Sequence, residues 1–139
     1  NTVNTVNTVQ LDLFKTTTTL SNAINQFLDS MVGVVSPATI NWYQRRLPFL
    51  VAYFNDCDIR LITHAKLCSW RASLVTRENR YTDHPNKPPV PGRLSPYTVH
   101  SYVRAARRLF RWVQAAGLIK DNPAAGLQPP RLPTRTPRK

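Results

Sequence analysis

The stretch SPYTVHSYVRAARRLFRW, residues 95–112, carries four arginines and no acidic residue. Its Ser-Pro start is typical of a helix N-terminus. Helical spacing then places Arg104, Arg108 and Arg111 on one side together with Tyr97 and Ser101. Guanidinium groups interspersed with short hydrogen-bonding side chains suit phosphate oxygens or the edge of a guanine base. We call these five residues the arginine face.

The opposite side of the same predicted helix is apolar. His100 and Arg107 lie at the flank, and an arc of about 120° holds the core stripe Val99, Tyr102, Val103, Ala106, Leu109, Phe110 and Val113. Like charges four residues apart disfavour an isolated helix by a few tenths of a kcal/mol per pair. A face that serves only solubility usually contains glutamate, and this face has none. The pattern therefore favours a polyanionic partner over bulk solvent.

The charge of the whole chain agrees with this interpretation. The 139 residues include 19 Lys and Arg against 7 Asp and Glu, a net charge of +12. From residue 93 onward Asp121 is the one acidic residue in the sequence. The same stretch holds ten basic residues, which are Arg93, Arg104, Arg107, Arg108, Arg111, Lys120, Arg131, Arg135, Arg138 and Lys139. Such asymmetry indicates nucleic acid or an anionic membrane surface as the partner.

Metal and membrane functions find little support in the sequence. Cys57 and Cys68 form no CxxC pair and the three histidines are scattered, so we expect two reduced thiols, no metal site and no cofactor. The most apolar run, LPFLVAYF, is far shorter than the roughly 20 residues of a membrane span. No signal peptide opens the sequence, and we expect a cytoplasmic, nucleoid-associated protein.

Four helices must position these side chains. Apolar spacing and Ser or Thr caps predict them over residues 19–33, 36–56, 63–77 and 95–117, with at most one further helical turn near Pro123. Pro48 should kink the second helix, since it lacks a backbone donor. The proline-rich stretch 78–93 predicts no regular element. The expected fold class is an all-α bundle.

The second predicted helix repeats the polar scheme in a weaker form. Thr39, Asn41, Trp42, Arg45 and Arg46 lie on its polar side or at its edges. Both this helix and the fourth begin Ser-Pro-x-Thr, so their N-terminal residues could enter one DNA groove together. Two interpretations of Trp42 are open. In the first it packs against a DNA sugar or a thymine methyl group, and in the second it is a core residue under the first helix.

The order of these motifs resembles the core-binding domain of tyrosine recombinases, the phage-integrase and Xer group. The resemblance covers about residues 18–133 and ends in the pattern GLIKDNPA followed by PRLP at 130–133. It implies a SAM-like bundle of four main helices that forms half of a clamp around a recombination half-site. By position it implies DNA contacts from Thr39, Asn41, Trp42, Arg45, Tyr97, Thr98, His100, Ser101 and Arg104. The charge pattern adds Arg46, Arg107, Arg108 and Arg111, and Arg93 in a proline-rich arm.

The resemblance also implies limits on what this chain does. The catalytic residues of such enzymes lie in a C-terminal domain, and no H-x-x-R element occurs here, so we expect no DNA cleavage by residues 1–139 alone. We assign 1–17 as a flexible leader, 18–127 as the DNA-binding domain and 128–139 as a basic linker. Residues 20–32 are expected to contact a neighbouring protomer on double-stranded DNA, with Phe27 and Met31 taking part.

Two other classes of function remain open from the sequence. One is a helical protein-interaction module whose basic face binds an acidic partner. The other is a basic amphipathic surface on anionic lipid, which would want apolar residues rimming the basic face, where Trp112 alone qualifies.

Overall fold

The computed structural model describes residues 18–76, 79–80, 90–92 and 94–132. These ranges contain the helices α2 (Leu20–Met31), α3 (Pro37–Gln44), α4 (Pro48–Phe54), α5 (His64–Thr76) and α6 (Pro96–Ala115), the 3₁₀ turn η1 (Ile59–Leu61) and the strands β1 (Asn79–Arg80) and β2 (Val90–Pro91). The predicted all-α class is confirmed, because every range predicted as helical contains helix and the strands are two residues long.

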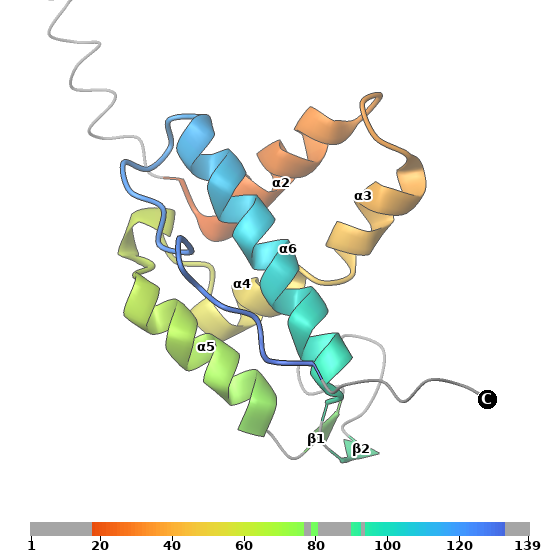
Figure 1. Cartoon of the computed structure of the whole chain (residues 1–139). Helices are drawn as coiled ribbons and strands as arrows, with labels where there is room; N and C mark the ends of the chain where they lie inside the picture. Colours follow the sequence, from red (N-terminus) through yellow and green to blue (C-terminus); the bar gives the residue numbers. More distant parts are fainter. Residues whose placement is uncertain (1–17, 77–78, 81–89, 93, 133–139) are drawn as a thin grey trace, which may run out of the picture.

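Helix α6 runs through the middle of the bundle, with α2 on one side and α5 on the other (Figure 1). Its predicted core stripe is confirmed except at Tyr102, which is only half-buried. Ala105 is buried as well, on the side of α6 that also carries Trp112. The Trp112 ring lies 5.8 Å from that of Phe27, so α2 covers this side of α6.

The second predicted helix is two helices, not one kinked helix. The break falls at Arg45–Leu47, immediately before Pro48, whose nitrogen has no hydrogen to continue the ladder. Leu50 N–H accordingly bonds to Leu47 O at 3.0 Å, three residues back instead of four. The break also changes the helical phase. Helical spacing counted through Pro48 would place Phe49 on the polar side, but its ring is half-buried and stacks on that of Tyr102 at 5.2 Å.

Helix α5 begins as predicted. The Thr63 hydroxyl accepts a hydrogen bond from Lys66 N–H at 3.2 Å, and Leu67, Trp70 and Leu74 are buried. The expectation of no regular element over 78–93 is wrong in one detail, since Asn79–Arg80 pairs antiparallel with Val90–Pro91. Pro91 tolerates this position because a two-stranded ladder has open edges that require no donor.

The chain after α6 turns back and completes the core. Gly117 adopts a φ of +82°, a left-handed conformation typical of the residue after a helix. The segment 118–132 then returns between α5 and α6 (Figure 1), where Ala124 and Leu127 are buried. Residues 123–126 form a hydrogen-bonded turn, in agreement with the prediction of at most one helical turn near Pro123. Hydrogen bonds from Arg71 Nη1 to Gln128 O at 2.8 Å and between His64 and Pro123 O tie the segment to α5.

Over the part of the chain that the structure describes, no helix combines the length and apolar character needed to span a bilayer. The predicted leader 1–17 and most of the predicted linker, residues 133–139, lie outside the described residues.

Candidate nucleic-acid interface

The arginines of α6 point away from the core. Arg104, Arg107, Arg108 and Arg111 are all exposed. Among the described residues the one salt bridge joins Arg60 to Asp58 at 2.8 Å, so no described carboxylate pairs with an arginine of α6. Unpaired like charges along a helix repel one another by a few tenths of a kcal/mol per pair. The face is therefore a concentrated positive surface that an external anion would stabilise.

Helix α3 reaches this face through Arg46, the residue that follows it by two positions. Arg46 Nε donates a hydrogen bond to the Ser101 hydroxyl of α6 at 3.1 Å. Arg46 Nη1 donates a second to the Trp42 carbonyl oxygen at 2.9 Å. The Ser101 hydroxyl in turn donates to Thr98 O at 2.7 Å. The predicted polar sides of the two helices thus meet, at the end of α3 and the second turn of α6.

The Trp42 ring fills the space between the two helices. The ring is half-buried and packs against the core cluster, so its interpretation as a core residue is confirmed in part. It also receives two cations, with the guanidinium carbon of Arg46 at 4.2 Å and that of Arg104 at 5.8 Å from its centroid. Such contacts are attractive because the ring face carries partial negative charge. Trp42 therefore holds Arg46 and Arg104 as well as packing against the core.

The environment of Arg46 is unusual for an arginine. Burial lowers the pKa of its guanidinium below the ordinary value, because desolvation disfavours the charged form. The nearby charges of Arg45 and Arg104 lower this pKa further, and Tyr102 acts in the opposite direction. The group stays charged at neutral pH, since an arginine titrates far above it.

The repeated Ser-Pro-x-Thr motif makes the same cap twice. The Ser36 hydroxyl accepts from Thr39 N–H at 3.3 Å, and the Ser95 hydroxyl accepts from Thr98 N–H at 3.1 Å. The two threonine hydroxyls also bond to the capping serines, at 3.1 and 3.0 Å. Thr39 and Thr98, predicted as DNA contacts from the resemblance, therefore also have a local role in the caps at which the two helices begin.

The two helix starts lie apart. In Figure 1 α3 begins at the outer edge of the molecule and ends beside the middle of α6, whereas α6 begins at the end near β1 and β2. Any duplex that both N-termini touch would have to meet them at separate points.

Of the remaining predicted contacts, Asn41 and Arg45 are exposed and His100 is half-buried, while Tyr97 is 40% exposed. Arg93 lies outside the described residues.

The expected contribution of α2 to protomer contacts needs one correction. Phe27 is only 5% exposed, because it packs edge-on against Tyr43 at 5.1 Å and against Trp112. Met31 is half-buried. The exposed apolar residues at this end of the bundle are Val32 and Val34, at 67% and 78%. Both lie in the turn that follows α2, and the apolar spacing within the helix did not indicate their exposure.

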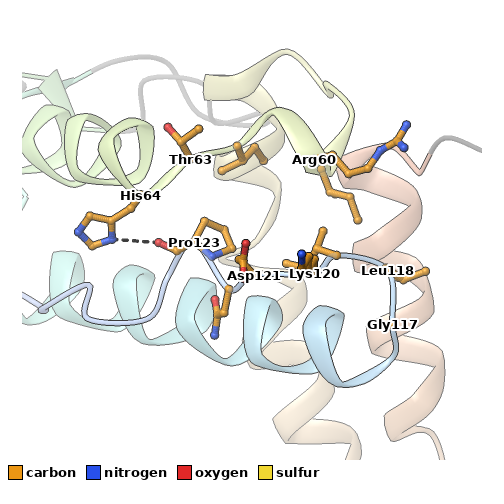
Figure 2. A pocket seen from close by; sticks show the side chains of 12 residues that line it. Arg60, Thr63, His64, Gly117, Leu118, Lys120, Asp121 and Pro123 are labelled. Carbon is orange, nitrogen blue, oxygen red and sulfur yellow. Dashed lines mark hydrogen bonds between the residues drawn. The ribbon is translucent and has the colours of Figure 1, made fainter. Parts of the chain in front are cut away.

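A separate groove of about 670 Å³ lies at the far end of α6 (Figure 2). Its walls are η1 with the start of α5 on one side and Gly117–Pro123 on the other. Figure 2 shows His64 and Pro123 joined across it by a 3.0 Å hydrogen bond from ring to carbonyl. None of the predicted DNA-contact residues lines this groove. The described residues also hold no cluster of three or more side chains able to ligate a metal.

No protein-family model and no curated protein matches the chain. Solved structures do match. The N-terminal domain of a phage integrase/site-specific recombinase from Haloarcula marismortui is 12% identical with a TM-score of 0.64, over 83% of this chain and 99% of that one. The integrase from mycobacterium phage Brujita is 20% identical with a TM-score of 0.59, over 83% of this chain and 34% of that one.

A lambda integrase dimer bound to a COC′ core site is 14% identical with a TM-score of 0.65, over 92% of this chain and 32% of that one. The chain thus spans about a third of the length of the two phage integrases and nearly all of the separate domain from Haloarcula marismortui. At these identities the likeness concerns the fold, which is the fold of phage integrase N-terminal domains.

Proposed function

We propose that this chain binds double-stranded DNA as the N-terminal core-binding part of a tyrosine recombinase, acting in the cytoplasm at the nucleoid. The arginine face of α6, continued by Asn41 of α3 and by Arg45 directly after α3, lies against the duplex. Its exposed guanidinium groups bind phosphates and, where they reach the major groove, guanine edges. Recognition prefers the half-site of one recombination site over other sequences.

The observation that carries this proposal is the absence of described carboxylates beside the exposed arginines of α6. A surface that binds an acidic protein partner generally offers apolar anchors at its centre, since buried aromatic and aliphatic groups supply most of the affinity of such interfaces. Here the arginine face continues toward the start of α6 with Tyr97, whose hydroxyl is of a kind that hydrogen-bonds to a sugar–phosphate backbone. The lambda integrase with the same fold was solved on a DNA core site, which supports the same partner for this chain.

The chemistry of recombination would then reside outside residues 1–139. In the proposed assembly this domain holds and orients the half-site, and a further domain of the same enzyme cleaves and rejoins strands. Neighbouring protomers on DNA would touch through the end of α2 and the exposed pair Val32 and Val34. This contact would bury apolar surface that is open in a single copy.

The choice among partners is tested by equilibrium titration of the chain against three fluorescent probes at low salt: a random-sequence 20-base-pair duplex, a poly-glutamate peptide and vesicles containing phosphatidylserine. The proposal expects the duplex to bind at least tenfold more tightly than the peptide, with the vesicles weaker still. Non-specific duplex affinities of order 10⁻⁴ to 10⁻⁶ M at physiological salt are typical for such proteins. Equal binding to duplex and peptide would mean that the face recognises charge alone and would contradict the proposal.

A further inference from the structure

We propose that Arg46 is a positioning residue that acts through Arg104, and that it makes no contact of its own with DNA. This inference rests on the proposed function, since it concerns how the same face is built. Sequence patterns assign Arg46 and Arg104 the same role, as two cations on one polar surface. Their contacts in the structure separate them.

Two of the five N–H donors of Arg46 are already engaged within the protein. Its single Nε–H bonds to Ser101 and one Nη1–H bonds to the Trp42 carbonyl, at 3.1 and 2.9 Å. Side-on recognition of a phosphate uses Nε and Nη2 together as a fork, and here only Nη2 remains on that edge. The side chain is also half-buried, and it lies closer to the Trp42 ring than Arg104 does. With Nε engaged and the side chain half-buried, Arg46 cannot offer this side-on fork to a phosphate.

Arg104 has the complementary situation. It is exposed, it takes part in no salt bridge among the described residues, and its guanidinium lies 5.8 Å from the Trp42 centroid. Arg46 occupies the near position on the same ring, at 4.2 Å, and its charge repels that of Arg104. With Arg46 in the near position, Arg104 contacts the ring only at the longer distance and stays exposed. The expected consequence of removing Arg46 is that Arg104 takes its place on Trp42 and withdraws from the surface.

Ser101 belongs to the same group of contacts as Arg46 and Trp42. Its hydroxyl accepts from Arg46 and donates to Thr98 O at 2.7 Å, so both of its functions are satisfied within the protein. The resemblance assigns Ser101 to the DNA contacts. Its hydrogen bonds indicate instead that it fixes the end of α3 on the second turn of α6.

A double-mutant cycle on duplex affinity tests the inference. The variants are Arg46→Lys, Arg104→Ala and the pair, each compared with wild type on one duplex at one salt concentration. Lysine keeps the charge but lacks the planar fork that reaches Ser101 and the Trp42 carbonyl together. We expect each single change to weaken binding about tenfold, and the pair to weaken it by about 10- to 20-fold instead of the additive factor of about 100. Arg60→Lys, at the far groove, serves as control and leaves the affinity unchanged.

A second readout reports on positioning without DNA. The indole N–H resonance of Trp42 in ¹⁵N-labelled free protein should shift in Arg46→Lys and in Ser101→Ala. In the duplex titration, both variants should show the same non-additive loss of affinity when combined with Arg104→Ala. Additive losses of about 100-fold, or near-wild-type binding by Arg46→Lys, would overturn the positioning role while leaving DNA binding intact. Failure of the wild-type chain to bind duplex would instead overturn the proposed function itself. Ser101→Ala keeps every charge, so it tests the inference even where Arg46→Lys does not fold.

Discussion

Arg46 and Ser101, 55 residues apart in the chain, are joined by a 3.1 Å hydrogen bond from Nε to the hydroxyl oxygen. This bond makes the polar sides of α3 and α6 one continuous surface. Bonds of this kind, with a charged donor in a partly buried place, are stronger than those between exposed neutral groups. The surface proposed to bind DNA is therefore held together by tertiary contacts and not by either helix alone.

The segment after α6 should be part of the folded domain. Leu127 is fully buried, whereas Leu132 is 38% exposed only five residues later. We expect Leu127→Ala to lower the free energy of unfolding by about 2–5 kcal/mol, through lost burial and the cavity left behind. Leu132→Ala is the matched control and should cost less than about 1 kcal/mol. Urea denaturation followed by circular dichroism measures both, and equal small effects would place the domain boundary before residue 127.

The serine that begins α6 should contribute to stability through its cap. Ser95→Ala removes the acceptor for Thr98 N–H and should cost about 1 kcal/mol. Ser69→Ala, at an exposed site inside α5, should be neutral or slightly stabilising because alanine is the better helix former. Thermal unfolding of the two variants distinguishes them. A Ser95→Ala protein as stable as wild type would mean that the cap contributes nothing measurable.

Acid should remove one small contribution to stability at η1. The hydrogen bond from Arg60 lowers the pKa of the Asp58 carboxyl below its ordinary value, and the Arg60 backbone N–H acts in the same direction. A carboxyl whose pKa is lower in the folded state stabilises the fold above its unfolded-state pKa and loses that effect as the pH falls through the folded-state value. Asp58→Asn should therefore cost up to about 1 kcal/mol at pH 7 and progressively less below pH 4. A cost that is independent of pH would contradict this account.

Much of the bundle follows from local signals in the sequence. Ser36, Thr63 and Ser95 each precede a helix and cap it with the predicted bond, so three helix starts could be predicted from a few neighbouring residues. The apolar stripe of α6 was predictable because its period is strict over twenty residues. The fold class and the exposed arginines of α6 followed directly from that period.

The features that were missed depend on contacts between distant residues. Pro48 ends one helix and begins another, which moves Phe49 from the polar side onto Tyr102; spacing counted through the proline cannot show this change of phase. Burial of Leu127 depends on a chain reversal after Gly117. The grouping of Trp42, Arg46 and Ser101 requires the crossing of two helices, so charge patterns placed Arg46 on the DNA side without showing that its donors are engaged.

The salt dependence of duplex binding tests the central claim most directly. Affinity for a random-sequence duplex is measured by fluorescence anisotropy from 50 to 300 mM salt, for wild type, for Arg104→Ala/Arg108→Ala and for the control Arg60→Ala. Each phosphate contact contributes about 0.9 to the slope of log K against log salt. We predict a steep slope for wild type and for the control, and a slope shallower by about 1.8 for the double variant. An unchanged slope in the double variant, or no binding by wild type at low salt, would contradict the assignment of the arginine face to DNA.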